Sequence, residues 1–85
     1  MRTVKFEKET LRELTEWFDK DVKTGKKILK IIEETKRNPY EGKKLQGDLA
    51  GFYSLRLTYQ DRIIYHVEEL EHCVYIHRVK THYGD

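Results

Sequence analysis

The apolar residues of this 85-residue chain change their spacing at Pro39, and this change limits the fold more than any other feature. Before Pro39 they recur every three or four residues, as on one face of a helix. After residue 51 they alternate, as on one face of a strand. Proline disfavours helical geometry in the residue before it, so the helical half should end at Asn38. The length suits one domain covering residues 1–85, and we expect an α+β fold.

The periodicity also predicts the individual elements. We expect a strand over residues 2–6 and then two helices over 8–18 and 22–37, the second capped by Asp21. Residues 40–51 hold three of the five glycines and should form a loop. Three strands over 52–59, 62–67 and 73–81 should follow as an antiparallel meander. The two helices should cover one face of the sheet, because their apolar stripes have nowhere else to be buried.

Composition excludes several classes of protein. The 17 Lys and Arg nearly balance the 15 Asp and Glu, so a surface for nucleic acid would have to be gathered by folding. Cys73 is the sole cysteine, so it forms no internal disulfide and makes no zinc site by itself. No run approaches the ~20 apolar residues of a membrane span, and the first six residues lack an apolar signal core. We therefore expect a cytoplasmic protein with no cofactor and no membrane partner.

Alternation gathers several basic side chains on one surface of the expected sheet: Arg56, Arg62, Arg78, Lys80 and His82. A hairpin loop over residues 59–61 would place Arg56 opposite Ile64, with Arg62 diagonal to it on the same face. A two-residue loop would put the two arginines on opposite faces. Guanidinium groups fit phosphate oxygens well, so the surface suggests a phosphate-binding site.

A basic surface beside a histidine fits the cleavage of RNA by its own 2′-hydroxyl. That reaction needs a base for the 2′ proton, cations for the phosphorane and an acid for the leaving 5′-oxygen, but no metal ion. Histidine exchanges protons near neutral pH and suits either proton-transfer role. The same basic residues also fit a solvated strand surface. We assign His66, His72 and His77 to surface or packing positions rather than to catalysis.

The second half of the chain carries short motifs in a specific order: Asn38-Pro39-Tyr40-Glu41-Gly42, Leu45-Gln46-Gly47-Asp48-Leu49-Ala50-Gly51-Phe52-Tyr53-Ser54, Asp61-Arg62-Ile63-Ile64-Tyr65 and His82-Tyr83. In order and spacing they resemble the YoeB branch of the RelE/ParE toxin superfamily, over essentially the whole chain. The resemblance implies a compact α+β fold and ribosome-dependent cleavage of messenger RNA. It also implies a cognate antitoxin that is small, acidic and partly disordered. Homodimers occur in that branch.

By position, the resemblance assigns roles to four residues. Arg62 matches the arginine that stabilises charge on the phosphate, and Arg56 matches a basic position on the same hairpin. His82 matches the general acid. Tyr83 matches the aromatic residue that positions the nucleotide.

The general base is where this chain departs from the family. YoeB-like toxins carry a glutamate shortly before the leucine that matches Leu45, where this chain has Lys43 and Lys44, while Glu41 matches a different glutamate upstream. RelE toxins use lysines in this region. One of the two lysines would then be the base or a phosphate clamp, unless Glu41 swings in or both lysines are only solvated. Two other functions stay open. The first is a toxin that blocks the ribosome without cutting, and the second, less favoured, is a ParE-like gyrase inhibitor.

Overall fold

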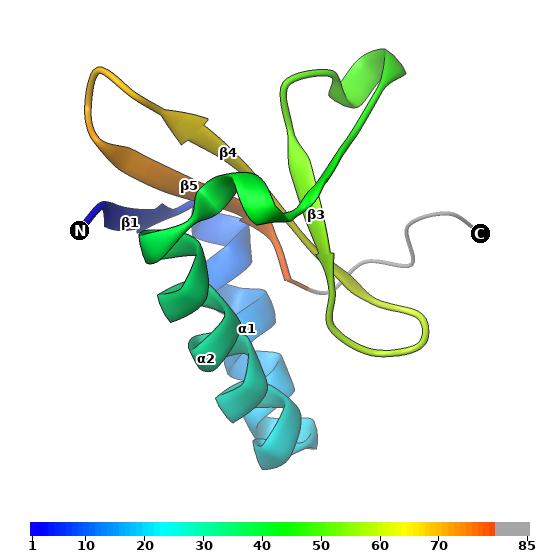
Figure 1. Ribbon diagram of the computed structural model, residues 1–85. Coiled ribbons are helices and arrows are strands. Elements are labelled where there is room, and N and C mark those ends of the chain that lie inside the picture. The colour runs from blue at the N-terminus through cyan, green and yellow to red at the C-terminus, as the bar shows by residue number, and fades with distance from the viewer. Residues whose placement is uncertain (80–85) are drawn as a thin grey trace.

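The computed structural model describes residues 1–79, which fold into two helices and one five-stranded sheet (Figure 1). The elements are β1 (Thr3–Phe6), α1 (Lys8–Lys20), α2 (Val22–Arg37), β2 (Lys43–Lys44), β3 (Tyr53–Arg56), β4 (Arg62–Glu68) and β5 (Cys73–Arg78). Short 3₁₀ turns over Pro39–Glu41 and Gly47–Leu49 flank β2. The expected α+β class is confirmed.

The sheet is larger than the meander that the sequence predicted. Its strand order is β1-β5-β4-β3-β2, and the antiparallel run β3-β4-β5 is the expected meander. β1 adds to it in parallel with β5, with Val4 opposite Val74. The two-residue β2 pairs with β3 inside the segment expected to be a loop. Two residues are too few to show an alternating pattern in the sequence, so periodicity could not predict this strand.

The helical half follows the sequence closely. Asp21 caps α2 as expected, because its carboxylate accepts hydrogen bonds from Lys23 N at 3.1 Å and Thr24 Oγ1 at 2.8 Å. The helices lie side by side (Figure 1). Gly25 permits their close approach, since a Cβ at this position would lie 2.8 Å from the Phe18 ring. The second helix ends at Arg37, as Pro39 requires.

Both helices pack on one face of the sheet, and the core lies between the two layers. Its buried side chains are Trp17, Ile28, Ile32, Leu57, Ile63, Tyr65, Val74, Ile76 and Val79. We call the opposite sheet face, which the helices do not cover, the open face. Ser54 and Ile64 on it are only 2% exposed, and its other residues are Arg56, Arg62, His66, Tyr75 and His77. Within residues 1–79 neither helix has the length and apolarity needed to cross a membrane.

Candidate active site

Arg56 and Arg62 stand directly opposite each other on β3 and β4, on the open face. Arg62 Nη1 donates to Ser54 Oγ at 3.4 Å, and Arg56 Nη1 donates to the Tyr59 carbonyl oxygen at 3.4 Å. Like charges placed opposite each other in a ladder repel, so binding an anion between the two guanidinium groups would relieve their repulsion. Two neighbouring guanidinium groups suit a phosphate in particular.

The register of this hairpin differs from the expected one. Arg56 faces Arg62, and the prediction that it faces Ile64 is wrong. The cause is Thr58, whose hydroxyl accepts two main-chain N–H groups of the loop at 3.2 and 2.9 Å. These bonds draw residues 57–61 into the turn, which is longer than the three residues predicted. The two arginines still share one face, as expected.

The short strand β2 separates the two candidate lysines. Direct partners in an antiparallel ladder point to the same face. Lys43 pairs with Ser54, so it projects from the open face beside the Arg62 guanidinium. Lys44 pairs with Tyr53, whose ring packs against the core, so it projects from the other side. Lys43 therefore joins the arginine pair on one surface, and Lys44 does not.

Glu41 lies on the helix side of β3. It lines a groove of about 280 Å³ between α2 and β3, together with the apolar side chains of Ile31 and Leu55. Arg56 also lines this groove. Glu41 therefore shares this groove with Arg56 and does not lie on the surface that carries Lys43.

The segment before Lys43 is fixed by Tyr65. The Tyr65 hydroxyl donates to the Pro39 carbonyl oxygen at 2.7 Å. Burial raises the pKa of the Tyr65 phenol to about 12, so the phenol remains a protonated donor at neutral pH. Gly42 makes this contact possible, because a Cβ there would lie 2.6 Å from the Tyr65 hydroxyl oxygen. The loop that carries Lys43 is therefore anchored to the core.

Helix α1 holds the main chain at the end of β5 through its three buried side chains. Thr10 Oγ1 donates to the His77 carbonyl oxygen at 2.6 Å, and Trp17 Nε1 donates to the Val79 carbonyl oxygen at 2.8 Å. Glu13 Oε1, between them on the helix, accepts the Val79 N–H at 3.0 Å. The three lie on one helical stripe. This stripe fixes the course of the chain as it leaves the sheet.

Arg78 turns toward α1. Its guanidinium meets the other carboxylate oxygen of Glu13, at 2.7 Å from Nε and 2.6 Å from Nη2. The Glu13 side chain is only 11% exposed, so the ion pair is largely buried on that side. Lys80, His82 and Tyr83, which the sequence also predicted at the site, lie outside the described residues.

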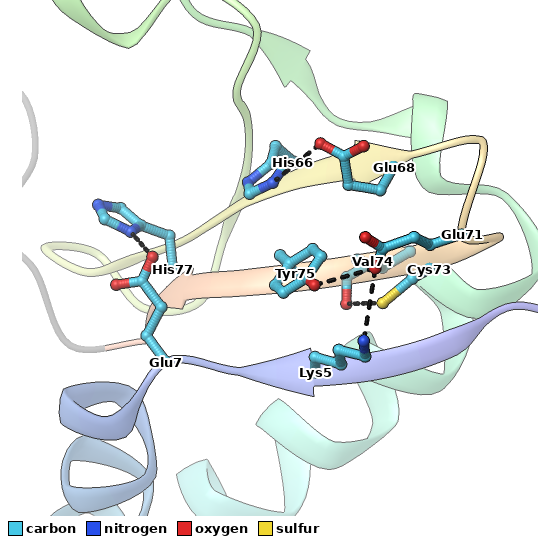
Figure 2. A network of polar contacts seen from close by, with 9 residues as sticks. All are labelled: Lys5, Glu7, His66, Glu68, Glu71, Cys73, Val74, Tyr75 and His77. Carbon is cyan, nitrogen blue, oxygen red and sulfur yellow. Dashed lines mark hydrogen bonds and ion pairs between the residues drawn. The ribbon is translucent and has the colours of Figure 1, made fainter.

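A run of rings crosses the open face beside the arginine pair. Tyr75 stacks on His66 with 5.0 Å between ring centroids, and Phe52 contacts both His66 at 5.0 Å and His77 at 5.1 Å. At the end of this run, Glu7 Oε1 lies 2.8 Å from His77 Nδ1 (Figure 2). A histidine bound to a carboxylate is a common catalytic arrangement, and it stands on the same sheet face as the arginines.

Reasoning from the sequence missed this pair of residues. Glu7 and His77 are 70 positions apart, and only the parallel pairing of β1 with β5 brings them together. The one available signal was the position of His77 in the last strand, next to Arg78. Alternation along β5 places His77 on the side of Tyr75, but it does not reveal that Glu7 lies beside the imidazole.

Comparison with known proteins identifies the family. Residues 6–83 match the family model described as YoeB-like toxin of bacterial type II toxin-antitoxin system. Toxin RelK of Mycobacterium tuberculosis is 31% identical over 87 residues, which span 98% of this chain and 100% of RelK. A YoeB/ParE toxin from Agrobacterium tumefaciens has a TM-score of 0.89 at 26% identity, covering 95% of this chain and 99% of that chain.

Two structures from Staphylococcus aureus are also similar. A chain of the heterotetrameric YoeB-YefM toxin-antitoxin complex has a TM-score of 0.83 at 25% identity, covering 98% of this chain and 99% of its own. A YoeB dimer has a TM-score of 0.83 at 25% identity, covering 96% and 98%. These matches confirm the fold that the resemblance implied. This chain belongs to the YoeB-like toxins of bacterial type II toxin-antitoxin systems.

Proposed function

We propose that this chain is an endoribonuclease that cleaves messenger RNA in the decoding site of the ribosome and so stops translation. The observation that carries the proposal is the facing pair of Arg56 and Arg62 on the open face, with Lys43 beside it. Three cations on one exposed surface suit the phosphate backbone of RNA. Membership of the YoeB-like toxins supports the same activity.

The proposed reaction breaks one phosphodiester bond without a metal ion. The ribose 2′-oxygen attacks the adjacent phosphorus, and the bond from phosphorus to the 5′-oxygen breaks. The products are a 2′,3′-cyclic phosphate and a 5′-hydroxyl. Arg62 stabilises the charge that develops on the phosphate, while Arg56 and Lys43 hold the neighbouring oxygens. His82 donates a proton to the leaving oxygen, and Tyr83 stacks on the nucleotide.

Arg78 and Lys80 have supporting roles in this proposal. Arg78 is paired with Glu13, whose carboxylate also holds the Val79 N–H. This pairing steadies the chain three residues before His82. The Arg78 side chain is still 45% exposed, so it also presents a cation to RNA. We propose Lys80 as a further phosphate contact from its place in the sequence alone.

We propose two protein partners by analogy with the relatives. YoeB from Staphylococcus aureus forms a heterotetramer with YefM and also a dimer. The corresponding antitoxin of this chain would be small, acidic and partly disordered, and would fold over the exposed cations. Homodimerisation is proposed on the same basis. We propose a cytoplasmic location for the same protein, because the proposed target is the ribosome.

The test is cleavage of a defined message on purified ribosomes, with new 5′ ends mapped by primer extension. The wild type should cut within the codon in the decoding site. Arg62→Ala and His82→Ala should each slow cleavage by roughly 10²-fold or more while the protein still sediments with ribosomes. Lys43→Ala and Lys44→Ala form a matched pair of neighbouring substitutions. Only the first should slow the reaction.

Two results would overturn the proposal. Arrested translation with intact messages would indicate a toxin that occupies the ribosome without cutting. Inhibition of gyrase supercoiling with normal translation would indicate a ParE-like activity.

A further inference from the structure

The proposed reaction still needs a group that takes the proton of the 2′-hydroxyl. Lys43 lies on the correct face, but in the proposed reaction it already holds phosphate oxygens beside Arg62. Glu41 lies in the groove on the helix side of β3. We infer that His77, oriented by Glu7, is the general base. This inference rests on the proposed function.

The geometry of the pair is that of a base held by a carboxylate. Glu7 Oε1 lies 2.8 Å from His77 Nδ1. An ionised carboxylate only accepts hydrogen bonds, so Nδ1 carries the hydrogen and Nε2 of the neutral ring keeps its lone pair. Among residues 1–79 no group hydrogen-bonds to Nε2, and the side chain is 32% exposed. Figure 2 shows the ring at the end of β5 with its second nitrogen turned away from Glu7.

The Glu7 side chain bonds to His77 and does not cap its own helix, α1. It occupies the N-cap position of α1, where a side chain usually accepts a hydrogen bond from the first turn, but it makes no such bond. Its main-chain N–H donates to the Ile76 carbonyl oxygen at 3.3 Å, which ties it to β5. The carboxylate is therefore fixed beside the imidazole by the backbone as well as by the side chain.

His77 points onto the open face next to a β-bulge. Tyr75 projects from that face and Ile76 lies in the core, so strand alternation returns His77 to the side of Tyr75. Ile64 pairs with Arg78, but the next residue, Tyr65, pairs with Ile76, so His77 has no partner in the ladder. Bulges often occur beside active sites, where they re-aim a side chain. The antiparallel pairing of β4 with β5 places the bulge, and His77 with it, at the same end of the sheet as the arginine pair.

The distance from His77 to the phosphate site suits one nucleotide. Ser54 accepts a hydrogen bond from the Arg62 guanidinium and so marks the phosphate site. It lies on β3 opposite Ile64 of β4, and β5 is the next strand beyond β4. Two strand spacings separate the main chains by about 10 Å, and both side chains project from the same face. A phosphate bound to Arg62 can therefore present its ribose to His77, whose ring is held in place by Phe52.

The proton transfers balance with the acid already proposed. His77 Nε2 takes the 2′-hydroxyl proton as the 2′-oxygen bonds to phosphorus, and His82 gives a proton to the departing 5′-oxygen. Glu7 stabilises the imidazolium that forms. A second proton exchange restores both rings, and no other reactant is needed. Imidazole suits both steps because it gains and loses protons in the physiological pH range.

The test measures single-turnover cleavage on programmed ribosomes by the full-length protein. His77→Ala should cleave roughly 10²- to 10⁴-fold more slowly, with unchanged sedimentation with ribosomes. Free imidazole should restore part of the rate. His66→Ala is the matched control, because His66 lies on the same face, contacts the same Phe52 ring and has a carboxylate, Glu68, at 3.8 Å. It should cleave like the wild type.

Glu7 is tested as a positioning residue by a double-mutant cycle. Glu7→Ala should slow the wild type but have no further effect on His77→Ala, whereas a purely structural role would persist in that background. Normal cleavage by His77→Ala, or a loss that imidazole does not restore, would overturn the inference while leaving the proposed function intact. An equal loss in His66→Ala would do the same. A wild type that cuts no message would overturn both.

Discussion

Tyr65 shows how one core residue controls the surface where RNA is proposed to bind. Its side chain is fully buried, yet its hydroxyl reaches the Pro39 carbonyl oxygen at 2.7 Å. That hydrogen bond fastens the segment before Lys43 to β4. The position of a solvated lysine therefore depends on a phenol in the core.

Tyr65→Phe should lower the free energy of unfolding by about 1–3 kcal/mol, because the Pro39 carbonyl loses its partner. Urea unfolding at neutral pH measures this difference. Tyr59→Phe is the control, since Tyr59 is 92% exposed and its change should have little effect. Equal stability of the two variants would contradict the anchoring role of Tyr65.

The same phenol predicts a loss of stability in alkali. Burial raises the pKa of Tyr65 to about 12, whereas a tyrosine in the unfolded chain ionises near pH 10. The raised pKa means that this contribution is complete below pH 10 and is lost as the pH rises toward 12. The free energy of unfolding of the wild type should therefore fall more steeply over this interval than that of Tyr65→Phe, as measured by urea unfolding at each pH.

Single residues were predictable from sequence where the cause was local. Asp21 was predicted to cap α2 and does so through contacts within three residues. The choice between Lys43 and Lys44 was not predictable, because it depends on which of them pairs with Ser54. The role inferred for His77 depends on a carboxylate far away in the sequence, and no local pattern reveals it.

At the scale of elements, α1 acts as a clamp on the end of β5. Its buried stripe makes three hydrogen bonds to the main chain of residues 77–79. The sequence predicted an apolar stripe here, but Thr10 and Glu13 are polar and are buried because each has a main-chain partner. These hydrogen bonds from α1 hold the end of β5 in place where its pairing with β4 stops.

Thr10→Val should weaken this clamp. The side chain keeps its shape but leaves the buried His77 carbonyl without its hydroxyl donor, so the free energy of unfolding should fall by about 1–3 kcal/mol. Thr15→Val is the matched control, because Thr15 lies on the exposed side of the same helix and its hydroxyl donates to the Leu11 carbonyl oxygen one turn earlier. Chemical unfolding of both variants gives the comparison. A smaller loss in Thr10→Val than in Thr15→Val would contradict the clamp.

At the scale of the molecule, the two sheet faces have different tasks. One face is buried under both helices, and the other presents the arginine pair and Lys43. The near balance of charge in the sequence conceals this division. Periodicity predicted the layers and the meander. It could not predict that β1 joins β5, because parallel pairing leaves no mark in the local spacing of residues.

The open face should make ribosome binding sensitive to salt. Each cation that contacts a phosphate releases counterions, so Arg56→Gln and Lys43→Gln should each reduce the slope of log affinity against log salt by about one contact. Lys30→Gln on α2 is the control and should leave the slope unchanged. Sedimentation with ribosomes at several salt concentrations measures the slopes. Equal slopes for all three variants would exclude the open face as the contact surface.

The parallel pairing of β1 with β5 has a consequence for the order of folding. The two helices and the β3-β4-β5 run are built from local contacts, whereas Val4 meets Val74 only after a long loop has closed. We expect β1 to dock after the transition state, so Val4→Ala should speed unfolding and leave the folding rate nearly unchanged in stopped-flow experiments. Because Glu7 follows β1 directly, its pairing with His77 belongs to that same late step. A refolding molecule would therefore orient its inferred base last, after His77 and the arginine pair are already in place.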